Sequence, residues 1–299
     1  MEGSLGIVGA SGFIGRELAR QATAAGWKVC GFSRQARGPE AGIPAWREWS
    51  DHPDFRGLTA LVNLAGEPIN RRWTAANRRL FHESRIGVTE TLRRGVEKLP
   101  ADERPRVLVN SSAVGIYGDR GDEILEDTAM AGSGYLAQLC RDWEAAADGV
   151  AALGLRVMKW RTGIVLGREG AGFKQMILPF RLGLGGRLGP GTQWLPWIHV
   201  EDLAASMLHG IGHASLVGPV NGTAPEPERN ADFTHKLAKA LKRPAFATVP
   251  PFVLKLMLGD FATATLASHR AVPRALLESG FRFRYPTLEM ALVELVGSR

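Results

Sequence analysis

A glycine-rich loop at residues 9–15, Gly-Ala-Ser-Gly-Phe-Ile-Gly, has the composition of a phosphate-binding loop. It follows a short apolar run at 5–8 and opens a helical pattern, so it joins a strand to a helix. In such a loop Gly9 permits the tight turn, Gly12 lets the backbone approach a pyrophosphate, and Gly15 lets the helix pack against the strand. The N–H groups and the dipole at the start of the helix favour phosphate charge. The loop predicts a dinucleotide site with contacts from Gly9, Ser11, Gly12, Phe13, Ile14 and Gly15.

The end of the next apolar run, residues 28–33, indicates which dinucleotide is bound. Sites for NAD usually carry Asp or Glu near this point to accept a hydrogen bond from the ribose 2′-hydroxyl. Here the run ends in Gly31-Phe32-Ser33-Arg34, with no carboxylate in reach. A guanidinium and a hydroxyl together suit a 2′-phosphate, so Ser33 and Arg34 favour NADP(H). The alternative is that Arg34 is only a solvated loop residue.

A second arginine, Arg85, stands inside an apolar pattern. The apolar residues around it recur at helical spacing, at Phe81, Val88, Leu92 and Val96. A charge on such a face needs an anionic partner. A cofactor phosphate and a buried carboxylate such as that of Glu67 are the two candidates, and the residues alone leave both open.

His199 is the histidine best placed for acid–base chemistry. It lies in Trp197-Ile198-His199-Val200-Glu201-Asp202, just before a predicted helix. An imidazole can gain or lose a proton near neutral pH. The alternative is a structural histidine that caps or orients the helix. The nearby Gln193, Trp194 and Trp197 are similarly open, because they could wall a substrate pocket or pack at an interface between lobes.

The elements that must position these residues alternate along the chain. Apolar runs alternate with helical patterns through the first 165 residues, which predicts βαβ units and a doubly wound parallel sheet. Expected strands are 5–8, 28–33, 60–64, 107–111 and 156–160, and expected helices are 13–25, 75–99 and 134–153. Glycine-rich residues 163–191 predict loops and short helices close to a ligand. Further helices at 232–241, 252–258, 273–279 and 288–296 predict a smaller C-terminal lobe, with the boundary placed between 1–221 and 222–299.

Composition limits the possible classes of protein. The 299 residues are 45% hydrophobic, with a formal net charge of +7 and two cysteines, Cys30 and Cys140, outside any CxxC or Cys/His cluster. Metal binding and a disulfide framework therefore lack support. No apolar stretch reaches the roughly 20 residues of a membrane span. The arginines are scattered without a nucleic-acid-binding motif. We expect a cytoplasmic protein without membrane or nucleic-acid partners, whose oligomeric state stays open.

Several longer segments carry a family resemblance. They are GASGFIG at Gly9, NLAGEPI at Asn63, SSAVGIYG at Ser111, LCRDWEAAA at Leu139, RTGIVLG at Arg161, QWLPWIHVEDLA at Gln193 and LLESGFRFRYPTLEMAL at Leu276. With them, nearly the whole chain resembles the extended and atypical short-chain dehydrogenase/reductases, and within these the epimerase-family, or NAD-dependent epimerase/dehydratase-like, branch. The resemblance implies an α/β Rossmann-type fold, a doubly wound parallel sheet with a smaller, mainly helical C-terminal lobe, which holds NADP(H). It implies cofactor contacts from Ser33, Arg34, Leu64, Ala65, Gly66, Arg85 and Val165. At the position of Arg85, relatives usually carry an asparagine near the cofactor, which favours the phosphate interpretation.

The same resemblance implies a catalytic Tyr-x-x-x-Lys pair with a Ser or Thr at the end of the fifth strand. The lysine charge stabilises a tyrosinate, because tyrosine with a pKa of about 10 is a poor base at neutral pH. Here Tyr135 stands at the tyrosine position, but Leu139 stands where the lysine belongs, and no lysine occurs within 133–153. Ala113 occupies the hydroxyl position, with Ser112 as its nearest substitute.

Two functions follow from this combination. The first is an NADP(H)-dependent oxidoreductase or epimerase-like enzyme that acts on an unknown small molecule, with Tyr135, Ser112 or His199 as the proton-transferring residue. The second is a non-catalytic NADP(H)-binding redox sensor or regulatory protein. Turnover of a substrate would separate the two.

Overall fold

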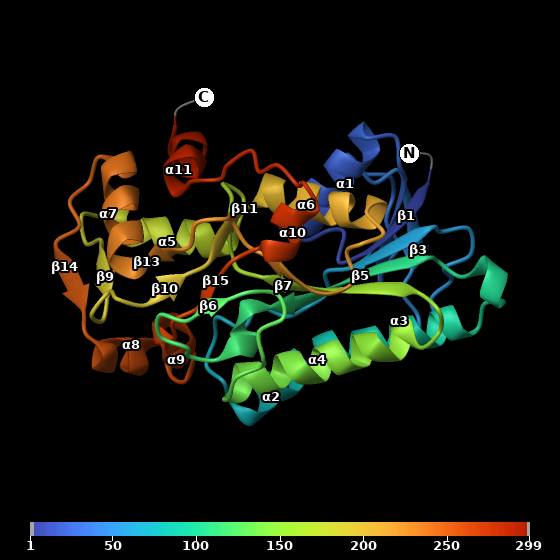
Figure 1. Ribbon diagram of the computed structural model, residues 1–299, viewed down its shortest axis with the longest axis horizontal. Coiled ribbons are helices and arrows are strands. Elements are labelled where there is room, and N and C mark those ends of the chain that lie inside the picture. The colour runs from blue at the N-terminus through green and yellow to red at the C-terminus, as the bar shows by residue number, and fades with distance from the viewer. Residues whose placement is uncertain (1–2, 298–299) are drawn as a thin grey trace.

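The computed structural model describes residues 3–297, and its centre is a parallel sheet of seven strands in the order β12-β7-β5-β4-β1-β2-β3 (Figure 1). The strands are β1 (Ser4–Val8), β2 (Lys28–Ser33), β3 (Ala45–Glu48), β4 (Ala60–Asn63), β5 (Val107–Ala113), β7 (Arg156–Thr162) and β12 (Gly218–Gly222). All five strands expected from the sequence are present. Two further strands, β3 and β12, were not predicted, because β3 is a partly exposed edge strand without an apolar run and β12 is Gly-Pro-Val-Asn-Gly.

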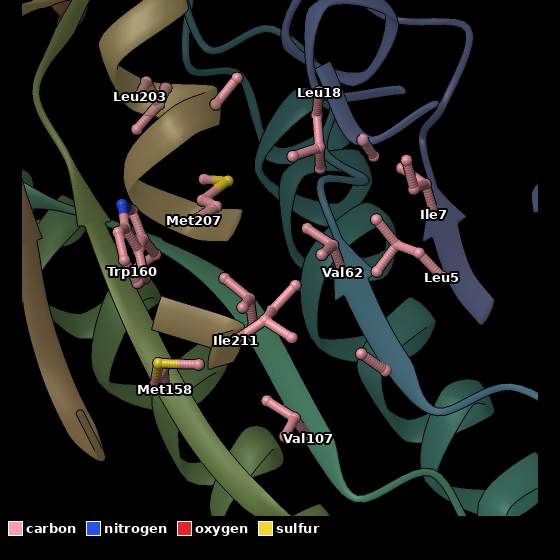
Figure 2. Close-up of a cluster of buried hydrophobic side chains, with 14 of the residues drawn as sticks. Leu5, Ile7, Leu18, Val62, Val107, Met158, Trp160, Leu203, Met207 and Ile211 are labelled. Atoms are coloured by element: carbon pink, nitrogen blue, oxygen red, sulfur yellow. The ribbon is translucent and has the colours of Figure 1, made fainter. Parts of the chain in front are cut away.

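Helices cover both faces of the sheet, which confirms the doubly wound α/β prediction. One face carries α1 (Phe13–Ala24) and α6 (Val200–Gly212), and the other carries α3 (Val88–Glu97) and α4 (Tyr135–Ala151). Figure 2 shows the first of these interfaces, a buried cluster that contains Leu5, Ile7 and Val62 of the sheet, Leu18 of α1, and Leu203 and Met207 of α6. Apolar strands covered on both faces are typical of a parallel sheet.

The helix expected at 75–99 is divided into three segments. They are α2 (Ala75–His82), the π-helical segment η1 (Glu83–Gly87) and α3. Phe81, Leu92 and Val96 are fully buried, as the apolar spacing predicts. A π-turn adds about one residue to a helical turn, and the hydrophobic pattern does not reveal so small an insertion. The side chain of Arg85 therefore projects from a turn of altered geometry.

The remaining segments form the C-terminal lobe and its connections to the sheet. The helices are α5 (Ala171–Arg181), α7 (Asn230–Leu241), α8 (Pro251–Leu258), α9 (Phe261–Leu266), α10 (Arg274–Glu278) and α11 (Leu288–Val296), with 3₁₀ turns η2 (Ala101–Glu103) and η3 (Val114–Tyr117). Short strands are β6 (Ile124–Leu125), β8 (Ile164–Leu166), β9 (Gly186–Leu188), β10 (Trp194–Leu195), β11 (Trp197–His199), β13 (Glu228–Arg229), β14 (Ala247–Val249) and β15 (Arg270–Ala271). Among the helices within 3–297, none is both long and apolar enough to cross a bilayer.

Segments that precede residue 221 in the sequence and segments that follow it both belong to this lobe. The strand pairs β9–β14, β10–β13 and β6–β15 each join an earlier segment to a later one. Phe173, Ile177 and Phe180 of α5 pack in one buried cluster with Phe233 of α7 and Leu292 of α11. The glycine-rich region therefore folds with the C-terminal helices, on the side of the molecule where the sheet strands end.

Candidate cofactor and active site

The glycine loop lies where the strand order of the sheet reverses. β1 pairs in parallel with β2 on one side and β4 on the other, and at the carboxyl end of such a strand doubly wound sheets have their ligand-binding crevice. Gly9 has a φ of +83°, and a Cβ there would lie 3.0 Å from the carbonyl carbon of Leu64. A Cβ at Gly15 would overlap the carbonyl oxygen of Gly9. Only glycine fits either position, so the loop brings bare backbone to the crevice.

The N-terminus of α1 faces this loop without a protein cap. Gly12 is its N-cap residue, no side chain caps the helix, and the first turn contains no acidic residue. The Phe13 ring lies against Gly167 and Gly170, in the loop that follows β8 and Val165. The crevice is thus bounded by the start of α1 and by this loop. Uncapped N–H groups together with the helix dipole form a site for a phosphate group.

The end of β2 carries two arginines. The Ser33 hydroxyl accepts hydrogen bonds from the Gln35 N–H (3.2 Å) and from Nε of Arg37 (3.3 Å). Arg34 is exposed and has no hydrogen-bond or ion-pair partner among residues 3–297. Arg37 was not predicted as a site residue, although a second arginine three residues after Arg34 could have indicated a second cation near the end of β2. It pairs with Glu40 at 2.8 Å and lies over the Trp46 ring.

The Arg85 side chain packs against the backbone that follows β4. A Cβ at Gly66 would lie 3.2 Å from Cζ of Arg85, which places the guanidinium against the Leu64–Ala65–Gly66 segment. Its terminal nitrogens donate to the carbonyl oxygens of Glu67 (2.9 Å) and Phe81 (3.3 Å). The Glu67 carboxylate instead pairs with Arg71 at 3.4 Å. The proposed ion pair between Arg85 and the Glu67 carboxylate is therefore absent, and burial lowers the pKa of the Arg85 guanidinium.

Tyr135 begins α4 and lies between an aromatic ring and a guanidinium. Its ring centroid is 5.0 Å from that of Trp73 and 4.5 Å from Cζ of Arg78. The hydroxyl oxygen is buried, and among residues 3–297 it has no hydrogen-bond partner. Burial raises the pKa of Tyr135, while the charges of Arg78 and Arg85 act in the opposite direction. Leu139, one turn later, is buried against Trp73 and Phe81.

Ser112 is buried and belongs to an ion-pair network. Its hydroxyl donates to Oε1 of Glu144 at 2.7 Å. The Glu144 carboxylate also accepts hydrogen bonds from Nε and Nη2 of Arg161, at 2.8 and 2.9 Å. Both charged side chains are buried. Ala113, which follows on β5, is half-buried. These contacts tie Ser112 to α4 and β7.

His199 is the N-cap of α6. Its Nδ1 accepts a hydrogen bond from the Glu201 N–H at 3.2 Å, and its Nε2 is 3.2 Å from Oε2 of Glu294 on α11. Its ring is 4.1 Å from the ring of Tyr285. The structure thus places His199 in the capping position that was the alternative to a catalytic role, at the contact between α6 and the lobe.

The aromatic residues near His199 are also engaged. Trp197 is fully buried in the lobe core and donates to the Glu226 carbonyl at 2.9 Å. Trp194 donates to Asp122 at 2.7 Å, and the guanidinium groups of Arg229 and Arg270 each lie 4.6 Å from its ring. Trp197 thus packs in the lobe, while Trp194 lies in a cluster with Asp122, Arg229 and Arg270. This cluster was not predicted, because its members are distant along the chain.

Comparison with known proteins identifies the family. Residues 5–220 match the model of the NAD dependent epimerase/dehydratase family, and residues 249–295 match a domain of unknown function, DUF1731. The chain belongs to the NAD-dependent epimerase/dehydratase family. The resemblance seen in the sequence is therefore confirmed.

Similar proteins match over nearly the full chain. The chloroplastic epimerase family protein SDR39U1 homolog of Arabidopsis thaliana is 36% identical over 97% of this chain and 85% of its own. The epimerase family protein YfhF of Bacillus subtilis is 34% identical over 99% of both chains. The crystal structure of human epimerase family protein SDR39U1 (isoform 2) with NADPH has a TM-score of 0.90 and 32% identity, covering 99% of this chain and 100% of that one.

Proposed function

We propose that this protein binds NADP(H) in the crevice between β1 and β4 and is an oxidoreductase or epimerase-like enzyme that acts on a small molecule. The observation that carries the proposal is the uncapped N-terminus of α1 beside Gly9, with Ser33 and Arg34 at the end of β2 where an acidic residue would select NAD. NADPH in the crystal structure of the human relative supports the choice of cofactor.

Each part of the crevice has a distinct task in this proposal. The N-terminus of α1 holds the pyrophosphate, with backbone contacts from Gly9 to Gly15. Ser33 and Arg34 hold the 2′-phosphate, and Arg37 adds a second guanidinium beside Ser33. The backbone of Leu64, Ala65 and Gly66 forms the wall on the β4 side, and Val165 belongs to the strand that leads into the opposite wall. The bound nicotinamide supplies or accepts a hydride.

Tyr135 is the proton-transferring group we propose for the reaction. Its hydroxyl is the one among the three candidates that has no protein partner within residues 3–297, whereas Ser112 is bonded to Glu144 and His199 caps α6. Tyr135→Phe should lower turnover by about 10²- to 10⁴-fold while NADPH binding stays intact. Unchanged turnover in Tyr135→Phe would exclude this residue.

Replacement of Arg34 tests the cofactor. Loss of a charge-assisted hydrogen bond in Arg34→Ala should weaken NADPH binding by about 10- to 100-fold and leave NADH binding unchanged. Dissociation constants for both cofactors are measured by calorimetric titration. Arg282→Ala, which removes an exposed arginine far along the chain, is the matched control. An equal loss of affinity for NADPH and NADH would remove the argument from the 2′-phosphate.

A non-catalytic NADP(H) sensor is the second candidate, and the buried Leu139 at the lysine position favours it. The test follows NADPH absorbance in the presence of a broad panel of carbonyl and enone compounds. Oxidation of NADPH by any member of the panel supports the enzyme. Tight binding without turnover across the panel supports the sensor.

A further inference from the structure

The Tyr135 hydroxyl is a buried polar group without a protein partner among residues 3–297. Nearly all buried polar groups in proteins have a hydrogen-bond partner, so an unpartnered hydroxyl needs an explanation. Around it lie apolar and aromatic side chains, including Trp73, Leu139 and Phe261, which pack in one cluster. A tyrosine in such surroundings loses its proton with difficulty unless a positive charge lies close by.

α4 itself supplies no such charge beside Tyr135. Residues 135, 139 and 143 share one face of the helix, because side chains four apart lie one above the other. Leu139 and Trp143 on this face are both buried. The Trp143 indole donates to the Thr89 hydroxyl at 3.2 Å, which fixes the ring against α3. Any cation acting on Tyr135 must therefore come from another element.

Arg85 of η1 brings a positive charge to this face. Its Cζ is 5.2 Å from the centre of the Trp143 ring, and its charge acts on Tyr135 and on Cys140, the residue after Leu139. Its hydrogen-bond acceptors are the carbonyl oxygens of Glu67 and Phe81 and the hydroxyl of Ser84. All three acceptors are neutral. No carboxylate among residues 3–297 forms an ion pair with it, so its charge can act on a group beside it.

Arg78 of α2 brings a second positive charge to Tyr135. Its Cζ lies 4.5 Å from the centre of the Tyr135 ring. Its guanidinium also pairs with Asp260 at 3.2 Å and is partly exposed, so solvent and the carboxylate weaken its effect. The Glu67 carboxylate, whose charge also acts on Arg85, pairs with Arg71, and the Glu144 carboxylate, whose charge acts on Cys140, pairs with Arg161. The charges of two cations therefore act on Tyr135, one from α2 and one from η1.

We propose that Arg85, together with Arg78, stabilises the tyrosinate form of Tyr135, supplying from η1 and α2 the positive charge that α4 lacks at Leu139. The proposal rests on the proposed function, in which Tyr135 transfers the proton. In a carbonyl reduction the Tyr135 O–H bond breaks and the proton moves to the substrate oxygen, while the substrate carbon receives the hydride of NADPH. The tyrosinate that remains is stabilised by the two guanidinium groups and regains its proton from water.

Titration of Tyr135 without cofactor tests this proposal. The chain has three tyrosines, so labelling of the tyrosine ring carbon that bears the hydroxyl gives three NMR signals, and Tyr135→Phe assigns the one required. Arg85→Gln and Arg78→Gln should each raise the pKa of Tyr135, and the double variant should raise it further. Arg85→Lys, which keeps the charge, should restore a value near the wild type. Arg79→Gln is the matched control, because Arg79 is the exposed neighbour of Arg78 on the same helix.

Two outcomes would overturn the proposal. One is a pKa of Tyr135 that does not change in Arg85→Gln while the affinity for NADPH falls, because Arg85 would then be a ligand of a cofactor phosphate. The other is a Tyr135 that does not titrate in the wild type below the pH of unfolding. If Arg85→Gln does not fold, Arg78→Gln still removes one of the two charges and gives the comparison with the wild type. Failure of the wild type to bind NADPH would refute the proposed function and leave the titration result standing.

Discussion

Gly15 shows at the scale of one residue why the cofactor loop is so narrowly constrained. A side chain there would overlap the Gly9 carbonyl oxygen and lie 2.8 Å from Cα of Ala10, and both are backbone atoms that cannot rotate away. We expect Gly15→Ala to lower the free energy of unfolding by about 1–3 kcal/mol and to weaken NADPH binding, because α1 must move off the loop. Urea denaturation measures the first effect and calorimetric titration the second.

Gly172 provides the control for this prediction. It lies in α5, and a Cβ there would meet nothing within 4 Å. Gly172→Ala should raise stability by about 0.5–1 kcal/mol, because alanine loses less conformational freedom in a helix than glycine. If Gly15→Ala behaved like Gly172→Ala, the close contact between α1 and the loop would be disproved.

Residues whose role depends on local spacing could be predicted from the sequence. Gly9 and Gly15 follow from a strand–turn–helix pattern, and the lack of an acid beside Arg34 follows from the strand end. The partners of Ser112 and Arg85 could not be predicted, because a hydroxyl and the carboxylate it binds, such as those of Ser112 and Glu144, are 32 residues apart. Such pairs depend on which helix covers which strand.

At the scale of elements, the buried pair of Glu144 and Arg161 joins α4 to β7, and the Ser112 hydroxyl joins the same carboxylate to β5. Removal of one member of a buried pair leaves the other charge uncompensated. Glu144→Ala should therefore lower the free energy of unfolding by about 3–5 kcal/mol, measured by urea denaturation. The same carboxylate accepts the Ser112 hydroxyl, whose removal in Ser112→Ala should cost only about 1 kcal/mol.

The Ser112→Ala variant also separates structure from catalysis. A structural hydroxyl predicts a small loss of stability and unchanged turnover. Loss of turnover at unchanged stability would instead mean that Ser112 acts on the substrate and that its bond to Glu144 is broken during the reaction. The five predicted strands gave no indication of this network, because their apolar patterns describe the faces of the sheet and not the polar residues at their ends.

At the scale of the whole molecule, the contact between the lobe and the sheet contains a buried histidine. His269 precedes β15, and its backbone N–H donates to the Trp194 carbonyl at 3.1 Å. Burial lowers the pKa of its imidazole from 6.5 to about 4. Between these two values the unfolded chain binds a proton that the folded chain does not. The contribution of His269 to stability is therefore lost as the pH falls from about 6.5 to about 4, by at most about 3 kcal/mol.

Comparison of the wild type with His269→Gln isolates this effect. Burial raises the pKa of Asp127 and Asp202, so these carboxyls favour the folded state as the pH falls and oppose the histidine. The difference in unfolding free energy between wild type and variant should shrink on acidification from pH 7 to pH 4. A difference that is constant over this range would mean that His269 is protonated in the folded protein.

The strand pairs that join the two halves of the lobe also set the order in which the protein can form on the ribosome. Phe173 and Ile177 emerge well before Phe233 and Leu292, the residues that bury them. At ordinary rates of translation this interval is on the order of ten seconds. During it α5 presents an uncovered apolar face while the first strands of the sheet can already pair. The nascent lobe therefore exposes apolar surface during this interval, and the synthesis of α11 ends that exposure.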